Sequence, residues 1–569
     1  MIVLGMNGPG ANSSSALIKN GKLISLIEEE RITRIKTAPH GLPFQSATLC
    51  LKEAGIDISK VDYIAWGWDC NKYQKILKKF NSKLNKKSKN YKYNLLNMVL
   101  NDPKIIKKDV EIFFNKKNYK KFPKIIFLQH HKCHAASAIF CSGFREANII
   151  TIDGSGEDLC TVIYEYKNNK IKTLKEFKLP HSLGAFYGTF TEYLGFKPDM
   201  DEGKTMGLAA YGKYSEKIQK KLDCVIKLDR KNSTYIFNQK MRYDGENNFG
   251  KKFTDNLVNL FGPSRNKNIS ALDKHYPDIA FNVQKRLEDI VINLARDAYK
   301  KNKISKFCIA GGVGMNCKMN GELLNTDFID DLFVQPASSD NGASLGAAQL
   351  VFYNKNIELK TELKHVYYGP SFSKNNVEKI LKEKKIKYSQ PKNMENMVAN
   401  LIIKQKKIIG RFDGSMEFGA RSLGNRSILA SPYYKDIRNY INIKVKNREN
   451  WRPFCPSVLK EDFNKIFIGN YEPKFMGVAV KIKKQFKKVF PACVHVDDTV
   501  RVQVVDRKSN YKYWKILKAV KKIAGYGILI NTSLNVQGEP IACSPTDALR
   551  TFYSSGLDCL IMGNKLIKK

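Results

Sequence analysis

A short apolar run followed by a histidine-containing, alanine-rich stretch is the feature of this sequence that most constrains its fold. The run is Ile125-Ile126-Phe127-Leu128, and residues 129–138 read QHHKCHAASA. This order predicts a strand, a turn and the start of a helix. His130 and His134 would then lie one turn apart on one helical face, where two imidazoles can share a metal ion. A second interpretation stays open, because H-x-x-x-H pairs also arise by chance or at a helix cap.

Two other segments supply carboxylates that suit the same kind of site. The apolar residues 147–152 are followed by Asp153 and two glycines, Gly154 and Gly156, which let backbone N–H groups face a phosphate. Asp340 lies at the start of an Ala/Gly-rich helical stretch. Two histidines and two carboxylates form a mixed N/O donor set that suits iron, zinc or manganese better than calcium. For Asp340 alone, a helix N-cap is the competing interpretation.

Length and composition indicate a globular, intracellular chain. The 569 residues are 43% hydrophobic, which is enough for about two or three cored domains. No apolar run approaches the length of a membrane span, and MIVLGMNG does not resemble a signal peptide. We therefore expect a cytoplasmic protein without a membrane span. The 12 cysteines are scattered without a C-x-x-C pair, which favours reduced thiols.

The formal net charge of +43 raises the question of a polyanionic partner, either nucleic acid or an anionic membrane. The excess is mostly lysine dispersed among asparagine and isoleucine, a pattern that AT-biased codon usage also produces. We therefore favour codon bias over nucleic-acid binding. Residues 71–124 are the extreme case, with 17 Lys, no Arg and three acids, and their interleaved apolar residues predict lysine-coated amphipathic helices.

Three further segments predict the organisation of the rest of the chain. Residues 13–27 are two apolar runs around Asn20-Gly21, which predicts a β-hairpin. A strand at 307–310 leads into Gly311, Gly312 and Asn316, a nucleotide-binding pattern. A change of composition near residues 358–373 predicts a domain boundary. Beyond this boundary, arginines beside glycines favour phosphate recognition, because a guanidinium offers two parallel donors and the background cation here is lysine.

Eight motifs, in order along nearly the whole chain, resemble the O-carbamoyltransferase family, which includes the nodulation protein NodU and the cephamycin and tobramycin carbamoyltransferases. They are EER at 29–31 with Arg34 and Lys36, HHxxH at 130–134, DGSGE at 153–157, EGKTMGLAAYG at 202–212, AGGVGMN at 310–316, the segment 417–427, RENWRPFCPS at 448–457 and NTSLNVQGEP at 531–540.

This resemblance implies an α/β and α+β protein with two domains. The first, expected at 1–357, is an actin-like (ASKHA, TsaD-like) domain that transfers the carbamoyl group and contains the metal and nucleotide cleft. The second, expected at 374–569, is a YrdC-like domain that makes carbamoyl-adenylate from carbamoyl phosphate and ATP. The acceptor implied by the family is a hydroxyl of a sugar or secondary metabolite. The implied cofactors are ATP with Mg²⁺, and Fe²⁺ or another divalent transition metal.

The resemblance also assigns roles to individual residues. Lys36, Lys446 and Arg452 are implied to be catalytic, Lys36 near the transfer site and the other two at the carbamoyl-phosphate and ATP site. The implied metal ligands are His130, His134, Asp153 and Asp340. The residues expected to bind nucleotide or carbamoyl phosphate are Gly154, Gly156, Gly311, Gly312, Asn316, Arg421, Arg501 and Ser533.

One segment departs from the family pattern. Family members usually have His-Asp, or His-Gly-Asp, before the Ser/Ala run of the first loop, whereas this chain has Gly10-Ala11-Asn12 there. By analogy the missing histidine is the base for the acceptor hydroxyl. The departure leaves three interpretations open: another base, an acceptor such as an amine that needs less activation, or a chain that no longer completes transfer. A smaller departure is Ala420, where the family commonly has proline.

Two functions of other classes remain as alternatives to a carbamoyltransferase. A tRNA-modification protein uses the same two domain types, and its binding to tRNA would depend steeply on salt. A nucleotide-binding protein without catalysis would bind ATP and release no pyrophosphate. The sequence does not identify the acceptor, the metal or the oligomeric state, and a homodimer is one of the arrangements left open.

Overall fold

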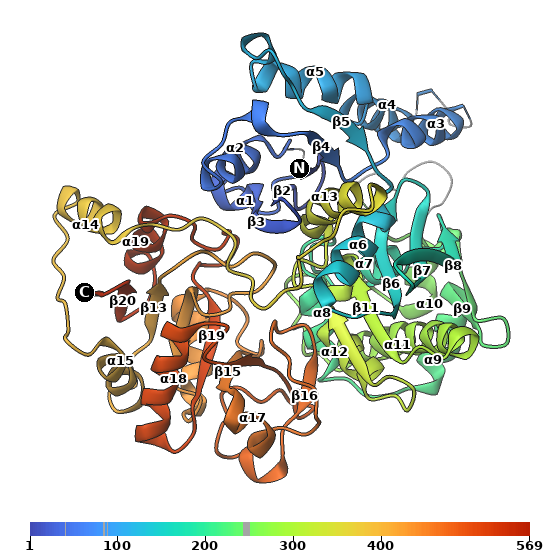
Figure 1. Cartoon of the computed structure of the whole chain (residues 1–569). Coiled ribbons are helices and arrows are strands. Elements are labelled where there is room, and N and C mark those ends of the chain that lie inside the picture. The colour runs from blue at the N-terminus through green and yellow to red at the C-terminus, as the bar shows by residue number, and fades with distance from the viewer. Residues whose placement is uncertain (40, 83–85, 88, 243–250) are drawn as a thin grey trace. The chain divides into compact units, whose positions relative to one another are not determined.

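The computed structural model describes all residues except 40, 83–85, 88 and 243–250, and the side chains of 89 and 90 are not described either (Figure 1). The chain forms two compact units. Unit 1 consists of Met1–Ile24 and His40–Glu362, and unit 2 consists of Ser25–Pro39 and Leu363–Lys569. The short segment Ser25–Pro39 therefore belongs to unit 2, although it lies near the N-terminus of the chain.

The first sheet has the strand order β3-β2-β1-β4-β5. Its central strand β1 pairs antiparallel with β2 and parallel with β4, and β4 pairs parallel with β5. The predicted hairpin is confirmed: Asn20 and Gly21 connect β2 to β3 with positive φ angles of 50° and 77°, as a tight primed turn requires. The strands are β1 (Ile2–Asn7), β2 (Ser14–Lys19), β3 (Lys22–Glu28), β4 (Tyr63–Trp66) and β5 (Lys124–Phe127).

The second sheet of unit 1 repeats this arrangement, with the strand order β12-β11-β6-β7-β8. Its central strand β6 pairs antiparallel with β7 and parallel with β11, and β11 pairs parallel with β12. Two sheets of the same order in one unit are the duplicated arrangement of an actin-like fold, and this confirms the expected fold class for unit 1. The strands are β6 (Ala147–Gly156), β7 (Leu159–Lys167), β8 (Lys170–Lys178), β11 (Lys306–Ala310) and β12 (Asp331–Val334).

Small residues bring the central helices of unit 1 into close contact. Helix α13 (Ala343–Asn354) packs against β1 and against α6 (His130–Ser142). A Cβ at Gly346 would lie 1.8 Å from the carbonyl oxygen of Cys133, and one at Gly5 would lie 1.9 Å from that of Ser344. Glycine is therefore required at both contacts.

The remaining helices of unit 1 are α2 (Phe44–Glu53), α3 (Cys70–Asn81), α4 (Lys89–Leu100), α5 (Pro103–Phe113), α7 (Leu183–Tyr193), α8 (Glu202–Ala209), α9 (Glu216–Val225), α10 (Asp255–Phe261), α11 (His275–Asn302) and α12 (Cys317–Leu324), and β9 (Ile226–Asp229) pairs with β10 (Thr234–Phe237).

Unit 2 is built on a seven-stranded sheet with the order β18-β15-β19-β14-β13-β20-β21. Neighbouring residues alternate between two apolar clusters: Ile428 lies in one and Leu429 in the other, and Leu560 and Ile561 do the same. Because successive strand residues point to opposite faces, both faces of this sheet are covered. The strands are β13 (Ile409–Phe412), β14 (Arg426–Ala430), β15 (Cys455–Leu459), β18 (Gln503–Val505), β19 (Ile528–Ser533), β20 (Cys559–Met562) and β21 (Lys565–Lys568).

A two-stranded sheet of β16 (Ala479–Lys481) and β17 (Thr499–Arg501) completes the strands of unit 2. Its helices are α1 (Glu29–Thr33), α14 (Lys374–Glu383), α15 (Met394–Ile403), α16 (Lys435–Tyr440), α17 (Lys460–Ile466), α18 (Tyr511–Ala524) and α19 (Pro545–Tyr553). The mixed α/β character is confirmed, and the YrdC-like identity of this unit stays a prediction.

Two global expectations can be compared with the structure. Across the described part of the chain, none of the helices combines the length and the apolar character that a membrane span requires. All 12 cysteines are free, in agreement with the expected reduced thiols.

Candidate functional site

The histidine stretch forms the N-terminal half of α6. Gln129 caps this helix by accepting a hydrogen bond from the backbone N–H of Lys132, and this cap fixes where the helix begins. His130 and His134 are fully buried, because the small residues of α6 allow α13 and the second sheet to pack closely around it. Two polar rings in such an environment need polar partners.

Four side chains from three elements converge beside α6. The Nε2 of His134 lies 2.9 Å from Oδ2 of Asp153, and the Nε2 of His130 lies 3.6 Å from Oδ1 of Asp340. The two Nε2 atoms are 3.0 Å apart. One donor atom from each of the four residues lies within 4.8 Å of every other, so these residues could hold a metal ion. Asp153 comes from β6, and Asp340 from the turn before α13.

The surroundings of His130 determine which nitrogen faces the cluster. Its Nδ1 lies 2.9 Å from the carbonyl oxygen of Gly67, an acceptor, so Nδ1 carries a proton and Nε2 is the nitrogen that faces the cluster. Burial opposes the charged imidazolium, but the carboxylates of Asp340 and Asp153 outweigh it and raise the pKa of His130. Lone pairs and carboxylates this close together require a bound cation or a proton, and the donor set fits a transition metal.

His131 is oriented away from the four-residue cluster. Its Nδ1 lies 2.8 Å from Oγ1 of Thr151. Burial, followed by the charges of His130 and His134, lowers the pKa of His131 to about 3, so this ring is neutral.

Two neighbours of the cluster were missed by the sequence analysis as functional positions. One carboxylate oxygen of Glu157 accepts hydrogen bonds from the backbone N–H of His130, at 3.0 Å, and of Asp69, at 2.8 Å. The ring of Trp68 lies 4.4 Å from that of His130. Glu157 stands in the recognised DGSGE motif, but only the tertiary structure shows that it holds the start of α6.

The segment that replaces the family His-Asp lies beside Asp340. The side-chain amide of Asn12 donates to Oγ of Ser339 at 3.3 Å, and that of Asn7 donates to the carbonyl oxygen of Asp340 at 3.2 Å. Asn12 has a φ of 66°, a left-handed conformation that asparagine tolerates better than most residues. An amide donor therefore stands at a position where family members usually have an ionisable group.

The four predicted glycines differ in what they allow. A Cβ at Gly154 would meet no atom within 4 Å, so its backbone is open to a ligand. A Cβ at Gly156 would lie 2.7 Å from Cδ2 of His130, and one at Gly311 would lie 2.2 Å from the carbonyl oxygen of Ile152. A Cβ at Gly312 would lie 3.2 Å from Oδ1 of Asp153. Gly156 and Gly311 thus serve packing around the cluster directly.

Asn316 belongs to a buried polar chain on α11 and α12. Its Oδ1 caps α12 by accepting from the N–H of Met319, and its Nδ2 donates to Oε1 of Gln284 at 2.8 Å. Gln284 in turn donates to Oε1 of Glu288 at 2.8 Å. Burial raises the pKa of Glu288 to about 7. No sequence motif marks Gln284 and Glu288, because both stand inside an ordinary amphipathic helix pattern.

In unit 2, Lys446 is buried at the end of a π-helical turn, Ile441–Val445. Its Nζ donates to both oxygens of Asn535, at 2.9 and 2.8 Å, and to the carbonyl oxygen of Ser533. Burial and the nearby charges of Arg448, Arg452 and Lys36 lower the pKa of Lys446. This lysine therefore orders the loop after β19 and lies among other cations.

Three arginines and Ser533 lie around the start of β15. Arg501 donates through Nε to Sγ of Cys455, the first residue of β15, at 3.1 Å. Burial, followed by the charge of Arg452, lowers the pKa of Arg448 to about 9, and Arg501 contributes to the same shift. The hydroxyl of Ser533 donates to Oδ1 of Asn535 at 2.6 Å. A cluster of cations that repel each other is suited to an anion.

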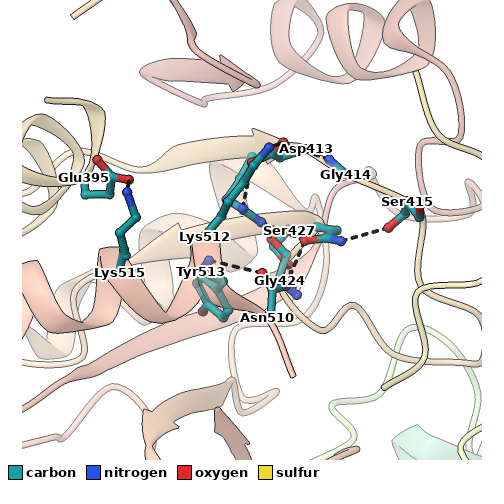
Figure 2. A network of polar contacts seen from close by, with 12 residues as sticks. Glu395, Asp413, Gly414, Ser415, Gly424, Ser427, Asn510, Lys512, Tyr513 and Lys515 are labelled. Atoms are coloured by element: carbon teal, nitrogen blue, oxygen red, sulfur yellow. Dashed lines mark hydrogen bonds and ion pairs between the residues drawn. The ribbon is translucent and has the colours of Figure 1, made fainter. Parts of the chain in front are cut away.

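The loop that carries Arg421 is organised by one buried carboxylate, Glu417. Its Oε1 accepts from the backbone N–H groups of Leu423, Asn425 and Arg426, at 2.7, 3.3 and 3.2 Å. Arg426 itself donates to backbone carbonyls, including that of Asp413 at 2.8 Å. Figure 2 shows how Asp413, Gly424 and Ser427 lie among the polar contacts around this loop.

The same network ties the loop to α18. Lys512 pairs with Asp413 at 2.8 Å, and Asn510 donates to Oδ1 of Asn425 at 2.9 Å (Figure 2). The amide of Asn531 on β19 donates to the carbonyl oxygen of Ser422, the residue after Arg421, at 3.2 Å. The backbone next to Arg421 is therefore hydrogen-bonded to β19, the strand that ends at Ser533.

Lys36 lies in the segment Ser25–Pro39 of unit 2, whereas the sequence analysis expected it in the N-terminal domain. Its Nζ lies 3.5 Å from Oε1 of Glu30. Arg34 donates to the carbonyl oxygens of Pro540 and Ile541, and Arg31 donates to that of Gly419 at 2.9 Å. These contacts hold the segment against the two loops that carry Arg421 and follow Ser533.

Comparison with known sequences identifies the family. The family model described as the carbamoyltransferase N-terminus matches residues 3–349, and the one described as the carbamoyltransferase C-terminus matches residues 399–569. The nodulation protein NolNO of Sinorhizobium fredii is 33% identical over 98% of this chain and 79% of its own length. An uncharacterized protein of Synechocystis is 33% identical over 100% of this chain and 96% of its own length.

Solved structures show more distant likeness. HypF of T. kodakarensis is 13% identical with a TM-score of 0.30, over 63% of this chain and 48% of that chain. A component of (R)-2-hydroxyglutaryl-CoA dehydratase from Acidaminococcus fermentans is 14% identical with a TM-score of 0.36, over 63% of this chain and 100% of that chain.

The two family models together cover both units and most of the motifs described above, in the order in which the family has them. The relatives match over nearly the whole chain. The chain therefore belongs to the carbamoyltransferase family.

Proposed function

We propose that this carbamoyltransferase makes carbamoyl-adenylate from carbamoyl phosphate and ATP in unit 2 and transfers the carbamoyl group to an acceptor in unit 1. The observation that carries the first half is the cation cluster of the buried Lys446 with the partly buried Arg448, Arg452 and Arg501, whose charges lower the pKa of Lys446 or of Arg448. Clustered cations of this kind are stabilised by a polyanion. Carbamoyl phosphate and the triphosphate of ATP are such polyanions.

In the first step, water hydrolyses carbamoyl phosphate to carbamate and phosphate. An oxygen of the carbamate then attacks the α-phosphorus of ATP. Pyrophosphate is the leaving group of this attack. Arg452 and Arg501 stabilise the charge on the departing phosphates, and Arg421 binds the donor phosphate. Lys446 holds Ser533 and Asn535 in place and adds positive charge. Lys36 is expected to join this cluster, because it contributes to the lowered pKa of Lys446.

In the second step the acceptor hydroxyl attacks the carbamoyl carbon of the adenylate, AMP leaves, and the hydroxyl proton passes to solvent. The cluster of His130, His134, Asp153 and Asp340 would hold a divalent transition metal such as iron. A metal there supplies Lewis acidity toward the adenylate phosphate. We expect Gly154, where a Cβ would meet no atom within 4 Å, and Asn316 to contact the nucleotide. Asn12 lacks an ionisable group, so in this chain it orients the acceptor and does not remove its proton. A sugar hydroxyl is the acceptor that the family relation favours.

Pyrophosphate release by the purified protein, with ATP, Mg²⁺ and carbamoyl phosphate, tests the first step. We expect Lys446→Ala and Arg452→Ala to lower the rate by at least about 100-fold. Lys444→Ala is the matched control, because Lys444 is exposed two residues before the buried Lys446. If the folded wild-type protein releases no pyrophosphate, or if both variants keep its rate, the adenylation proposal is wrong.

A further inference from the structure

The helices α3, α4 and α5 form a separate surface of unit 1, between strands β4 and β5. Helix α4 packs against both α3 and α5, and Lys107 of α5 lies over the ring of Phe127 on β5, an edge strand of the first sheet (Figure 1). None of the residues proposed to bind metal, nucleotide or carbamoyl phosphate comes from these helices. We call the described part of residues 70–123, which contains these three helices, the helical insert.

The helical insert is the most basic part of the chain. Residues 71–124 contain 17 lysines and three acids, Asp102, Asp109 and Glu111. The lysines of α5, Lys104, Lys107 and Lys108, are all exposed. A surplus of this size on a short segment attracts an anionic surface.

The helical insert also exposes apolar side chains to an unusual degree. Of the 24 large hydrophobic residues that are exposed among the described residues, eight lie between Phe80 and Phe113. Codon bias accounts for lysine and isoleucine content, but not for the exposure of apolar side chains on helices that are otherwise packed. A patch of this kind indicates an interaction site.

The spacing of these residues gives the patch its form. Leu95, Leu96 and Val99 lie on one face of α4 and are 41%, 51% and 54% exposed, while Asn94 on the opposite face is buried. On α5, Ile105 and Ile112 are 39% and 61% exposed, and Lys108 lies between them on the same face. Aliphatic side chains interleaved with lysine are the pattern of a helix that lies in a membrane interface.

The same features disfavour other occupants. A second copy of this chain would bring two lysine-rich surfaces together and would be repelled. Nucleic-acid surfaces commonly use arginine for base contacts, and residues 71–124 contain none. Phe80, Tyr93 and Phe113 are exposed, but the centre of the exposed α4 face is formed by Leu95, Leu96 and Val99, which are aliphatic and offer no ring for base stacking.

We propose that the helical insert docks the protein on a membrane surface that contains anionic lipids, with Leu95, Leu96 and Val99 entering the interface and the lysines contacting lipid phosphates. The binding is peripheral and reversible. It places unit 1 beside a membrane, while the residues of the proposed carbamoyl-transfer site come from elements outside the insert.

Flotation of the full-length protein with vesicles tests this proposal, using phosphatidylcholine alone or with phosphatidylglycerol. We expect binding only to the anionic vesicles, weakened by added salt. Lys104→Gln/Lys107→Gln/Lys108→Gln should weaken it by roughly 100-fold. Leu95→Ser/Leu96→Ser/Val99→Ser should weaken it at low salt as well, where electrostatic attraction alone would persist.

Two control variants separate this surface from the general positive charge of the protein. Lys217→Gln/Lys220→Gln/Lys227→Gln removes three exposed lysines elsewhere in unit 1, and Ile236→Ser/Ile269→Ser/Leu272→Ser removes three exposed aliphatic residues. Both should bind vesicles like the wild type. Equal losses in the controls, or no vesicle binding at all, would overturn the proposal. The proposal would also be overturned if tRNA binding required Lys104, Lys107 and Lys108 while vesicle binding did not require them.

Discussion

At the scale of single residues, buried carboxylates carry much of the organisation of this protein. Glu417 is fully buried and accepts three backbone hydrogen bonds from the loop that follows it. Glu157 holds the N-terminal end of α6, and burial raises its pKa. Glu288 ends a polar chain that begins at Asn316. All three acids are buried and accept hydrogen bonds from the protein.

Replacing Glu417 by glutamine should destabilise unit 2. The substitution keeps an oxygen acceptor but removes the charge that strengthens the bonds to Leu423, Asn425 and Arg426, so we expect a loss of about 1.5–3 kcal/mol. Denaturant unfolding measures this loss, and pyrophosphate release should fall with it because Arg421 lies in the same loop. Glu461→Gln removes a half-exposed acid that pairs with Lys518 and should cost less than about 1 kcal/mol. Equal losses in the two variants would contradict this role of Glu417.

Glu288 should make the stability of the protein depend on pH. Its pKa is raised from 4.5 to about 7 in the folded state, so the folded protein retains this proton up to a higher pH than the unfolded chain does. The resulting stabilisation is complete below about pH 4.5 and is lost as the pH rises toward 7. The full difference corresponds to about 3 kcal/mol.

The variant Glu288→Gln keeps the hydrogen bond from Gln284 without the ionisation. The difference between the unfolding free energies at about pH 5 and at about pH 8 should therefore be smaller for the variant than for the wild type. A pH dependence that is the same in both proteins would show that Glu288 does not titrate in this window.

At the scale of elements, α6 supplies both histidines of the candidate metal cluster. Its first turn presents His130 and His134 on one face, and its small residues allow Gly346 of α13 to approach the backbone of Cys133. The carboxylate of Glu157 accepts a hydrogen bond from the N–H of His130 at the start of α6, where the helix dipole favours negative charge. The orientation of the two rings is therefore set by packing and by a residue outside the helix.

Glu157→Ala should lower the affinity for a divalent transition metal by about 10–100-fold, because the ring of His130 loses the contact that fixes its backbone. Titration of the metal-free protein with Co²⁺, followed by its visible absorption, measures the affinity without any assay of activity. Asp158→Asn is the matched control, since Asp158 pairs with the partly exposed Lys72 and Lys178. An unchanged Co²⁺ affinity in Glu157→Ala would exclude this positioning role.

At the scale of the whole molecule, the division into two units predicts how ligands affect stability. The four proposed metal ligands all lie in unit 1, and the cation cluster lies entirely in unit 2. A ligand that binds one unit stabilises that unit through its own binding free energy. A metal ion should therefore stabilise unit 1 alone, and a phosphate ligand should stabilise unit 2 alone.

Scanning calorimetry with and without Co²⁺ tests this division. At a free concentration of about 100 times the dissociation constant, the metal should stabilise unit 1 by about 2.7 kcal/mol. The unfolding transition of unit 2 should not move. His134→Ala should abolish the shift, while Lys446→Ala should leave it intact. A shift of the whole unfolding profile together would show that the units unfold as one.

The sequence by itself determined the features that depend on neighbouring residues. The period of α6 places His130 and His134 on one helical face, and Asn20-Gly21 supplies the conformations of a tight hairpin turn. The motifs were sufficient to recognise the carbamoyltransferase family. These features follow from local geometry, which a few consecutive residues dictate.

Only the tertiary structure decided the features that depend on distant contacts. It placed Ser25–Pro39, and with it Lys36, in unit 2, because Arg31 and Arg34 bind carbonyl groups more than 380 residues away in the sequence. It also gave Glu157, Glu417 and Glu288 their roles. Burial and contacts between packed segments arise only when the whole chain folds, so the motifs that contain Glu157 and Glu417 do not reveal these roles, and no recognised motif contains Glu288.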